Sequence, residues 1–88
     1  MHVIKKDGRR EKFDERKLYA TCYYPCIAAN LTKEEAEIAC RQVVAAVRKM
    51  SKGKSHVKSQ VLFKTVVRVL KRHDKKAAFL YETHRDIS

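Results

Sequence analysis

The first eighteen residues constrain the fold most, because two short strand-like runs flank the strongest hairpin signal that a sequence offers. Residues 3–6 and 10–13 lie on either side of Asp7-Gly8. A two-residue type I′ loop favours this pair, because both of its central positions take positive φ. Asp14 follows the second run and is typical of a helix N-cap, whose side chain accepts a backbone N–H. The sequence therefore predicts a β-hairpin that leads directly into a helix.

The first helix is expected to start after Asp14 and to bury one apolar face. The residues at helical spacing on that face are Leu18, Cys22, Cys26 and Ala29. Pro25 has no N–H, and its ring clashes with the carbonyl of Thr21. We therefore expect either a kink at Pro25 or a helix end near Tyr24, followed by another short turn.

A second helix and a short strand are expected in the middle of the chain. Thr32 and Glu35 form a capping box, in which each side chain satisfies a free backbone N–H, and the helix they open runs to about Met50. Its apolar stripe consists of Ala36, Ala39, Cys40, Val43, Val47 and Met50. Residues 51–55 break the helix, and residues 56–58 predict a third strand.

The end of the chain predicts two more helices. Ser59 is expected to cap a third helix that carries Leu62, Val66, Val69 and Leu70 inward. A last helix over residues 75–85 buries Ala77, Ala78 and Tyr81. At 88 residues the chain suits one modest core. We expect a single domain, residues 1–88, of the α+β class and mostly helical.

The formal charge of +11 is concentrated in one segment. Residues 41–76 carry twelve Lys or Arg against one acid, Asp74, whereas residues 19–40 carry one base against three acids. A field of this sign attracts nucleotides, nucleic acid or an acidic protein surface. No apolar run approaches the roughly 20 residues of a membrane span, and the N-terminus lacks a secretory signal. A cytoplasmic protein without a membrane partner is expected.

Catalytic and metal-binding patterns are missing from the sequence. The three cysteines are few and odd in number, which argues against a disulfide framework, and buried thiol packing is favoured over a zinc site that would need a fourth ligand. There is no G-x-x-x-x-G-K-[ST] loop, no pair of carboxylates suited to a magnesium cage and no activated nucleophile. We therefore expect a binding protein rather than an enzyme, with no metal site.

A nucleotide site can be assembled from the hairpin and the helices that follow it. Lys5 and Lys6 point to opposite faces of the first strand, and Lys17 lies about one turn into the first helix. Lys58 and Ser59 lie where the third helix begins, and a helix N-terminus attracts phosphate. Candidates for an apolar slot that takes a base are Phe13, Leu18 and Leu62.

Residues 3–18 resemble the opening signature of the ATP-cone, the regulatory nucleotide-binding domain at the N-terminus of many ribonucleotide reductases. The pattern V-x-K-[RK]-D-G-R-x-E-x-[FI]-[DN]-x-x-K-[IL] is filled by Val3, Lys5, Lys6, Asp7, Gly8, Arg9, Glu11, Phe13, Asp14, Lys17 and Leu18. Residues 57–59 with Leu62 are similar to the short strand that leads into the third helix of the cone. Ala78, Tyr81 and Arg85 resemble the close of its last helix, so the resemblance spans the chain.

The resemblance implies about four helices capped by a small three-stranded sheet, which is made of the N-terminal β-hairpin and one short strand. ATP or dATP, with or without Mg²⁺, would bind beneath the hairpin. The resemblance assigns the phosphates to Lys5, Lys6 and Lys17, with Lys58 and Ser59 beside them. It assigns the base to Val3, Phe13, Leu18 and Leu62, with Glu11 at the adenine edge and Asp14 nearby. Phe63 is also expected at the site, but it departs from the pattern, because many cones carry a histidine at this position.

The leading interpretation is a stand-alone regulatory module that binds an adenine nucleotide. Its nucleotide state would be transmitted through a homo-oligomer or a partner protein such as a ribonucleotide reductase subunit. A cone that keeps its fold without its ligand is one alternative. Another is a small nucleic-acid-binding protein that uses the basic surface of residues 41–76, which explains the charge better. Both functions are compatible, with nucleotide controlling nucleic-acid binding.

Overall fold

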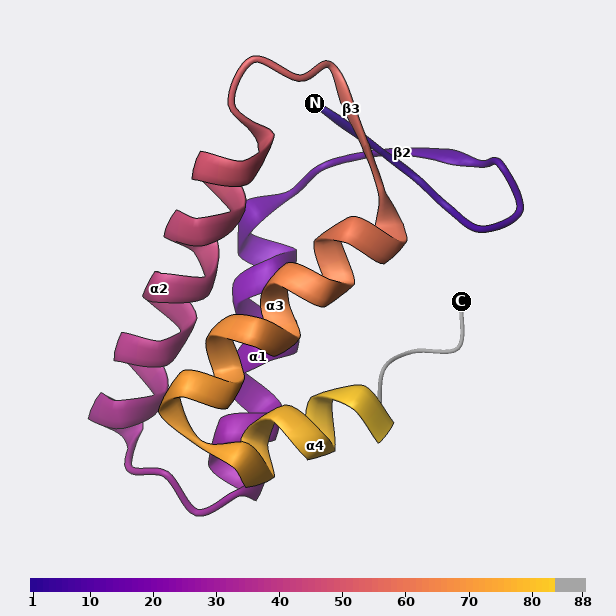
Figure 1. Cartoon of the computed structure of the whole chain (residues 1–88). Helices are drawn as coiled ribbons and strands as arrows, with labels where there is room; N and C mark the ends of the chain where they lie inside the picture. Colours follow the sequence, from indigo (N-terminus) through magenta and orange to yellow (C-terminus); the bar gives the residue numbers. More distant parts are fainter. Residues whose placement is uncertain (84–88) are drawn as a thin grey trace.

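The computed structural model describes residues 1–83 and contains a small sheet packed at one end of four helices (Figure 1). The elements in chain order are β1 (His2–Ile4), β2 (Arg10–Lys12), α1 (Glu15–Ala28), α2 (Lys33–Ser51), β3 (His56–Lys58), α3 (Ser59–His73) and α4 (Lys75–Thr83). The predicted α+β class, with four helices and three strands, is confirmed. Arg85, which the sequence assigns to the last helix, lies outside the described residues.

The sheet joins the start of the chain to its middle. Its strand order is β2-β1-β3, so β1 is central. Val3 lies opposite Glu11 in the antiparallel pair with β2, and opposite Val57 in the parallel pair with β3. A parallel pair needs a long crossover, which α1 and α2 provide here. The hairpin is therefore held over the N-terminal end of α3, where β3 ends.

The hairpin loop has three residues, 6–8, so the predicted two-residue type I′ loop is wrong. The Lys5 N–H donates to the Arg9 carbonyl at 2.7 Å, and the Gly8 N–H donates to the Lys5 carbonyl at 2.9 Å. Only Gly8 takes a positive φ, of +90°. The Asp7 carboxylate instead accepts the backbone N–H of Arg9 at 3.0 Å and its Nε at 2.7 Å. These hydrogen bonds lower the pKa of Asp7 and fix the longer loop.

The helix N-termini are only partly as predicted. Asp14 caps α1 by accepting the Arg16 N–H at 2.9 Å, and the capping box of Thr32 and Glu35 opens α2, which confirms both predictions. The predicted cap of α3 is wrong. Lys58 is the N-cap and makes no side-chain capping bond, while Ser59 is the first helical residue. Because β3 ends at Lys58 and α3 begins at Ser59, no residue lies between them, and the last strand residue takes the cap position.

Pro25 does not end α1 near Tyr24, because the helix continues to Ala28. The proline is buried in the last turn, where few further intrahelical bonds remain to be lost. Beyond the helix, Asn30 adopts a left-handed φ of 68°, and its N–H donates to the Ile27 carbonyl at 2.9 Å. The chain therefore turns towards α2 after Asn30 rather than at the proline.

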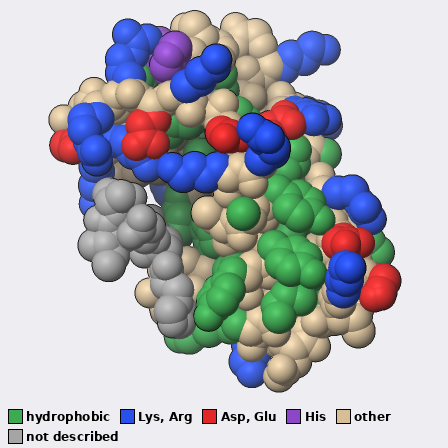
Figure 2. All heavy atoms as spheres, turned by 180° about the vertical axis from the view of Figure 1, so that it is seen from behind, with side chains coloured by type: hydrophobic (Ala, Val, Ile, Leu, Met, Phe, Trp, Pro, Cys, Tyr) green, Lys and Arg blue, Asp and Glu red, His purple; other side chains and the backbone are tan. Residues whose placement is uncertain are grey.

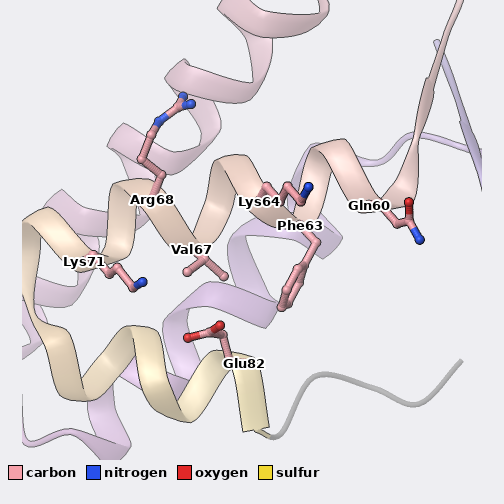
Figure 3. A pocket seen from close by; sticks show the side chains of 7 residues that line it. All are labelled: Gln60, Phe63, Lys64, Val67, Arg68, Lys71 and Glu82. Atoms are coloured by element: carbon pink, nitrogen blue, oxygen red, sulfur yellow. The ribbon is translucent and has the colours of Figure 1, made fainter.

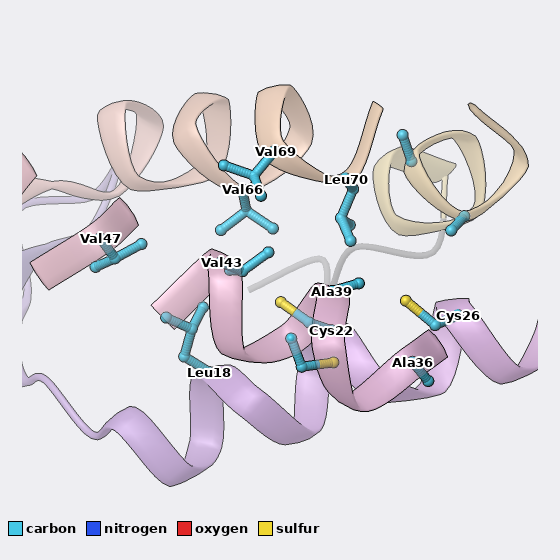
Figure 4. Packing of buried hydrophobic residues seen from close by; sticks show 13 residues of the cluster. Leu18, Cys22, Cys26, Ala36, Ala39, Val43, Val47, Val66, Val69 and Leu70 are labelled. Carbon is cyan, nitrogen blue, oxygen red and sulfur yellow. The ribbon is translucent and has the colours of Figure 1, made fainter. Parts of the chain in front are cut away.

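The core lies between α1, α2, α3 and α4 (Figure 4). Its largest fully buried side chains are Leu70, Val43, Val47, Val66, Cys22, Cys26 and Cys40. All three cysteines are free thiols that pack as small apolar groups, as predicted. Burial raises the pKa of Cys22 to about 12, which keeps this thiol protonated at neutral pH. A thiol in this state is a poor nucleophile and a poor metal ligand.

One face of the molecule carries a charged region and an apolar region. From behind, Lys, Arg, Asp and Glu side chains gather near the top, and hydrophobic side chains cover much of the lower half (Figure 2). Tyr24, Ile27 and Phe79 are large apolar residues with exposed fractions of 72%, 41% and 61%. Among the described residues, no helix combines the length and apolar character that a membrane crossing requires.

Candidate functional site

A small pocket of about 160 Å³ opens where the hairpin meets α1, α3 and α4. We call it the inner pocket. Its lining residues come from the hairpin, the connection between β2 and α1, α1 itself, α3 and α4: Val3, Lys5, Glu11, Lys12, Phe13, Asp14, Lys17, Leu18, Thr21, Leu62 and Tyr81. The pocket therefore depends on the complete fold, because segments nearly eighty residues apart in the chain meet in it.

The inner pocket combines an apolar floor with a charged rim. Val3 and Leu18 are each only 7% exposed, whereas Lys17 is exposed at the rim. The Lys5 Nζ lies 3.9 Å from the Glu11 Oε1, and the Lys5 side chain is 22% exposed. A half-buried ammonium beside an apolar floor suits a ligand with a flat apolar part and an anionic part.

Eight of the twelve residues expected at the site line the inner pocket. They are Val3, Lys5, Glu11, Phe13, Asp14, Lys17, Leu18 and Leu62. The other four lie outside this lining: Lys6 is exposed in the hairpin loop, Lys58 and Ser59 lie at the start of α3, and Phe63 faces away. The structure thus brings together the apolar residues with two of the expected lysines.

Three lining residues were not expected from the sequence: Lys12, Thr21 and Tyr81. Thr21 follows Lys17 by four residues, so helical spacing alone indicates that the two share an edge of α1. Tyr81 was expected only as a buried residue of the last helix. Nothing in the sequence indicates that α4 reaches the hairpin side of the molecule, since this depends on how the helices pack.

Phe63 lies on the other side of the inner-pocket wall. Its ring stacks on Tyr81 with 5.4 Å between the ring centroids and 22° between the ring planes. Phe63 also lines a second depression of about 560 Å³ between α3 and α4 (Figure 3). We call this depression the outer cleft; it is lined by Gln60, Phe63, Lys64, Val67, Arg68, Lys71 and Glu82. The Phe63–Tyr81 stack therefore separates the two depressions.

Metal-binding groups are sparse in the part of the chain that the structure describes. Residues 1–83 contain no cluster of three or more His, Cys, Asp or Glu side chains able to hold a metal ion. The two carboxylates of the inner pocket, Glu11 and Asp14, form ion pairs of 3.9 Å with Lys5 and Arg16 respectively. A divalent cation at this pocket would therefore need most of its oxygen ligands from a bound phosphate chain and from water.

Comparison with known proteins gives a match along almost the whole chain. The family model described as the ATP cone domain matches residues 1–87. The transcriptional repressor NrdR of Dictyoglomus thermophilum is 39% identical over 69 residues, which are 78% of this chain and 45% of the relative. NrdR of Thermosipho melanesiensis is 35% identical over 89 residues, which are 97% of this chain and 58% of the relative. The chain spans about half the length of these curated relatives.

Proposed function

Because the chain belongs to the ATP-cone domain family, we propose that it is a non-catalytic regulatory module that binds ATP or dATP in the inner pocket. The observation that carries this proposal is the meeting of Lys5, Lys17 and an apolar floor in one pocket. A purine base needs an apolar slot with a few polar groups at its edge. A polyphosphate chain needs cations with freely rotating donors, which lysine supplies.

Each lining group has a distinct role in this proposal. The base lies on Val3, Leu18 and Leu62, and Phe13 closes one side. Glu11 accepts a hydrogen bond from the adenine amino group, and the 3.9 Å separation of the Lys5 Nζ from the Glu11 Oε1 is too long for a hydrogen bond that would hold Lys5 there. Lys5 then turns to the phosphates, where it meets Lys17. Ligand binding therefore exchanges an internal ion pair for two charge-assisted contacts.

The volume of the inner pocket supports a ligand that is only partly enclosed. Pockets for small ligands usually measure roughly 300–1,000 Å³, and the inner pocket measures about 160 Å³. The base occupies the enclosed part, and the sugar and phosphates extend over the rim. Lys6, Lys58 and Ser59 serve the phosphates there, and Mg²⁺ binds through phosphate oxygens and water. The nucleotide state is then passed on by self-association or by a partner such as a ribonucleotide reductase subunit in the cytoplasm.

Thermal unfolding in the presence of nucleotides tests the proposal. Saturating ATP or dATP is expected to raise the melting temperature, because a ligand at 100 times its Kd stabilises the folded state by about 2.7 kcal/mol. Lys5→Ala combined with Lys17→Ala should abolish the rise. Lys52→Ala combined with Lys54→Ala is the matched control, since both lysines are exposed outside the inner pocket. An unchanged melting temperature with millimolar ATP, dATP and ADP would rule out the proposed function.

Nucleic-acid binding is the second candidate function. It is favoured by the twelve basic residues in residues 41–76 and by relatives that are named transcriptional repressors. Binding through phosphate contacts predicts an affinity for duplex DNA that falls steeply with salt concentration. Lys5→Ala should leave this affinity unchanged. The absence of binding to duplex DNA at low salt would exclude this candidate.

A further inference from the structure

The outer cleft has three chemically different sides, which restricts what can occupy it. Lys64, Arg68 and Lys71 form a basic side on α3, and Val67 with Phe63 provides an apolar floor (Figure 3). Glu82 on α4 forms the opposite, acidic side. A free phosphate chain would use only the basic side. An amphipathic helix can use all three sides: its carboxylates would face the basic side, an apolar side chain would lie on the floor, and a cation would face the acidic side.

The basic side of the cleft has no partners of its own in the described part of the chain. Of the twelve basic residues in residues 41–76, only Arg48 forms an ion pair within residues 1–83, with Glu15 on α1. Lys64, Arg68 and Lys71 are exposed and follow one another at helical spacing along α3. The rise of 1.5 Å per residue spreads them over about 10.5 Å, which is two turns of a facing helix.

The first turns of α2 carry the complementary pattern. Ile38 is 45% exposed, whereas Ala36, Ala39, Cys40, Val43 and Val47 of the same helix are buried. Glu34 and Glu37 precede it, and Arg41 follows three residues later. None of these three charged residues forms an ion pair within residues 1–83. We call Glu34, Glu37, Ile38 and Arg41 the α2 ridge.

We propose that the outer cleft is the docking site for the α2 ridge of a second copy of this chain. Ile38 packs on Val67 and Phe63, the two glutamates face the basic side, and Arg41 faces Glu82. Residues 19–40 are also the most acidic part of an otherwise basic chain, so charge complementarity favours this occupant over any other segment of a second copy. In Figure 1, α2 forms the left edge of the molecule and α3 and α4 lie to its right. Because the outer cleft is lined by α3 and α4, one copy offers both surfaces.

The resulting contact is heterologous, because the two copies contribute different surfaces. Such contacts produce closed rings or open chains rather than a two-fold dimer. The net charge of +11 on each copy opposes association, but salt at about 0.15 M limits long-range repulsion to roughly 8 Å. We therefore expect assembly that strengthens from low to physiological salt and weakens again at molar salt.

The test measures mass in solution by sedimentation velocity from micromolar to millimolar protein. A cleft variant, Lys64→Glu with Arg68→Glu, and a ridge variant, Glu34→Lys with Glu37→Lys, should each stay monomeric. Each reversal places like charges against each other, which raises the dissociation constant by roughly 100-fold or more. An equimolar mixture of the two variants should assemble again, because the unchanged ridge meets the unchanged cleft and the reversed ridge meets the reversed cleft with opposite charges.

The mixing experiment also shows that the variants are folded, since only folded chains can pair. Lys49→Glu with Lys52→Glu is the matched control, because it changes the charge equally at exposed positions outside both surfaces. The proposal is wrong if the wild type stays monomeric at millimolar concentration, or if the control disrupts assembly as much as the cleft variant. It is also wrong if the mixture stays monomeric. If the wild type is monomeric and binds duplex DNA, and the cleft variant does not bind it, the outer cleft is a nucleic-acid site instead.

Discussion

The inner pocket and the outer cleft lie on two sides of the same wall but are built in opposite ways. The inner pocket gathers residues from β1, β2, α1, α3 and α4 around two nearly buried side chains, Val3 and Leu18. The outer cleft needs only α3 and α4, and its charged residues are exposed. The inner pocket is thus part of the core, whereas the outer cleft is a feature of the surface. Substitutions in the inner pocket should therefore change both the stability of the fold and ligand binding. Substitutions in the outer cleft should change binding without changing stability.

The largest effect on stability should come from truncating a buried side chain that lines the inner pocket. Leu18→Ala removes a side chain that is 7% exposed and packs in the helical core, so unfolding should become easier by about 2–5 kcal/mol. Lys64→Ala in the outer cleft should change stability by no more than about 0.5 kcal/mol. Urea unfolding of both variants measures the difference. Similar losses in the two variants would contradict the distinction between core and surface.

A smaller effect should come from the hairpin loop. Gly8 has φ of +90°, and a Cβ placed there would meet no atom within 4 Å. Gly8→Ala should therefore lower stability by about 1–2 kcal/mol through backbone strain alone. Because the hairpin forms one side of the inner pocket, ATP affinity should fall, while self-association through the outer cleft should not change. Calorimetric titration with ATP and sedimentation measure the two readouts.

Gly53→Ala is the control for the hairpin prediction. Gly53 has φ of +79° with equally open surroundings, but it lies between α2 and β3, away from the inner-pocket lining. Gly53→Ala should lower stability by about as much as Gly8→Ala does, and ATP affinity should stay as in the wild type. An equal loss of affinity in both variants would show that affinity follows global stability rather than hairpin geometry.

The ionisation of the core thiol, which lies in neither depression, should have no effect at neutral pH and should appear only in alkaline solution. Cys22 has a pKa raised by burial from the ordinary 9.0 to about 12. The unfolded chain therefore releases this proton first, and stability should fall as pH rises from about 9 towards 12, by up to about 1.4 kcal/mol per pH unit. The difference between wild type and Cys22→Ala across this range isolates the thiol. A constant difference would contradict the burial argument.

The sequence predicted the local features of the fold better than the features that depend on packing. Asp14, Thr32 and Glu35 act within three residues of their own positions, so their capping roles were recognisable from spacing. The hairpin was recognised, but its loop type was wrong because the Asp7–Arg9 hydrogen bonds compete with the type I′ geometry. Local signals of this kind are strong only where no side chain offers the backbone a second partner.

The candidate sites depended more on tertiary structure. Lys5 and Lys17 were predicted because both lie within the signature of residues 3–18, which covers the hairpin and the start of α1. Tyr81 was missed because only helix packing brings α4 to the pocket. The outer cleft was not recognised at all, because exposed lysines and arginines on α3 look like an ordinary solvated face until Glu82 is seen across from them.

The parallel pairing of β1 with β3 also determines when the inner pocket can exist. Val3 pairs with Val57 in the parallel pair, and contacts between residues so distant in sequence form slowly. During synthesis the hairpin leaves the ribosome before β3 and remains without its third strand until residue 58 has emerged. We therefore expect the helical core of α1 and α2 to gain structure first. The nucleotide site would then be among the last parts of the fold to form. Only chains that have completed folding would therefore bind nucleotide.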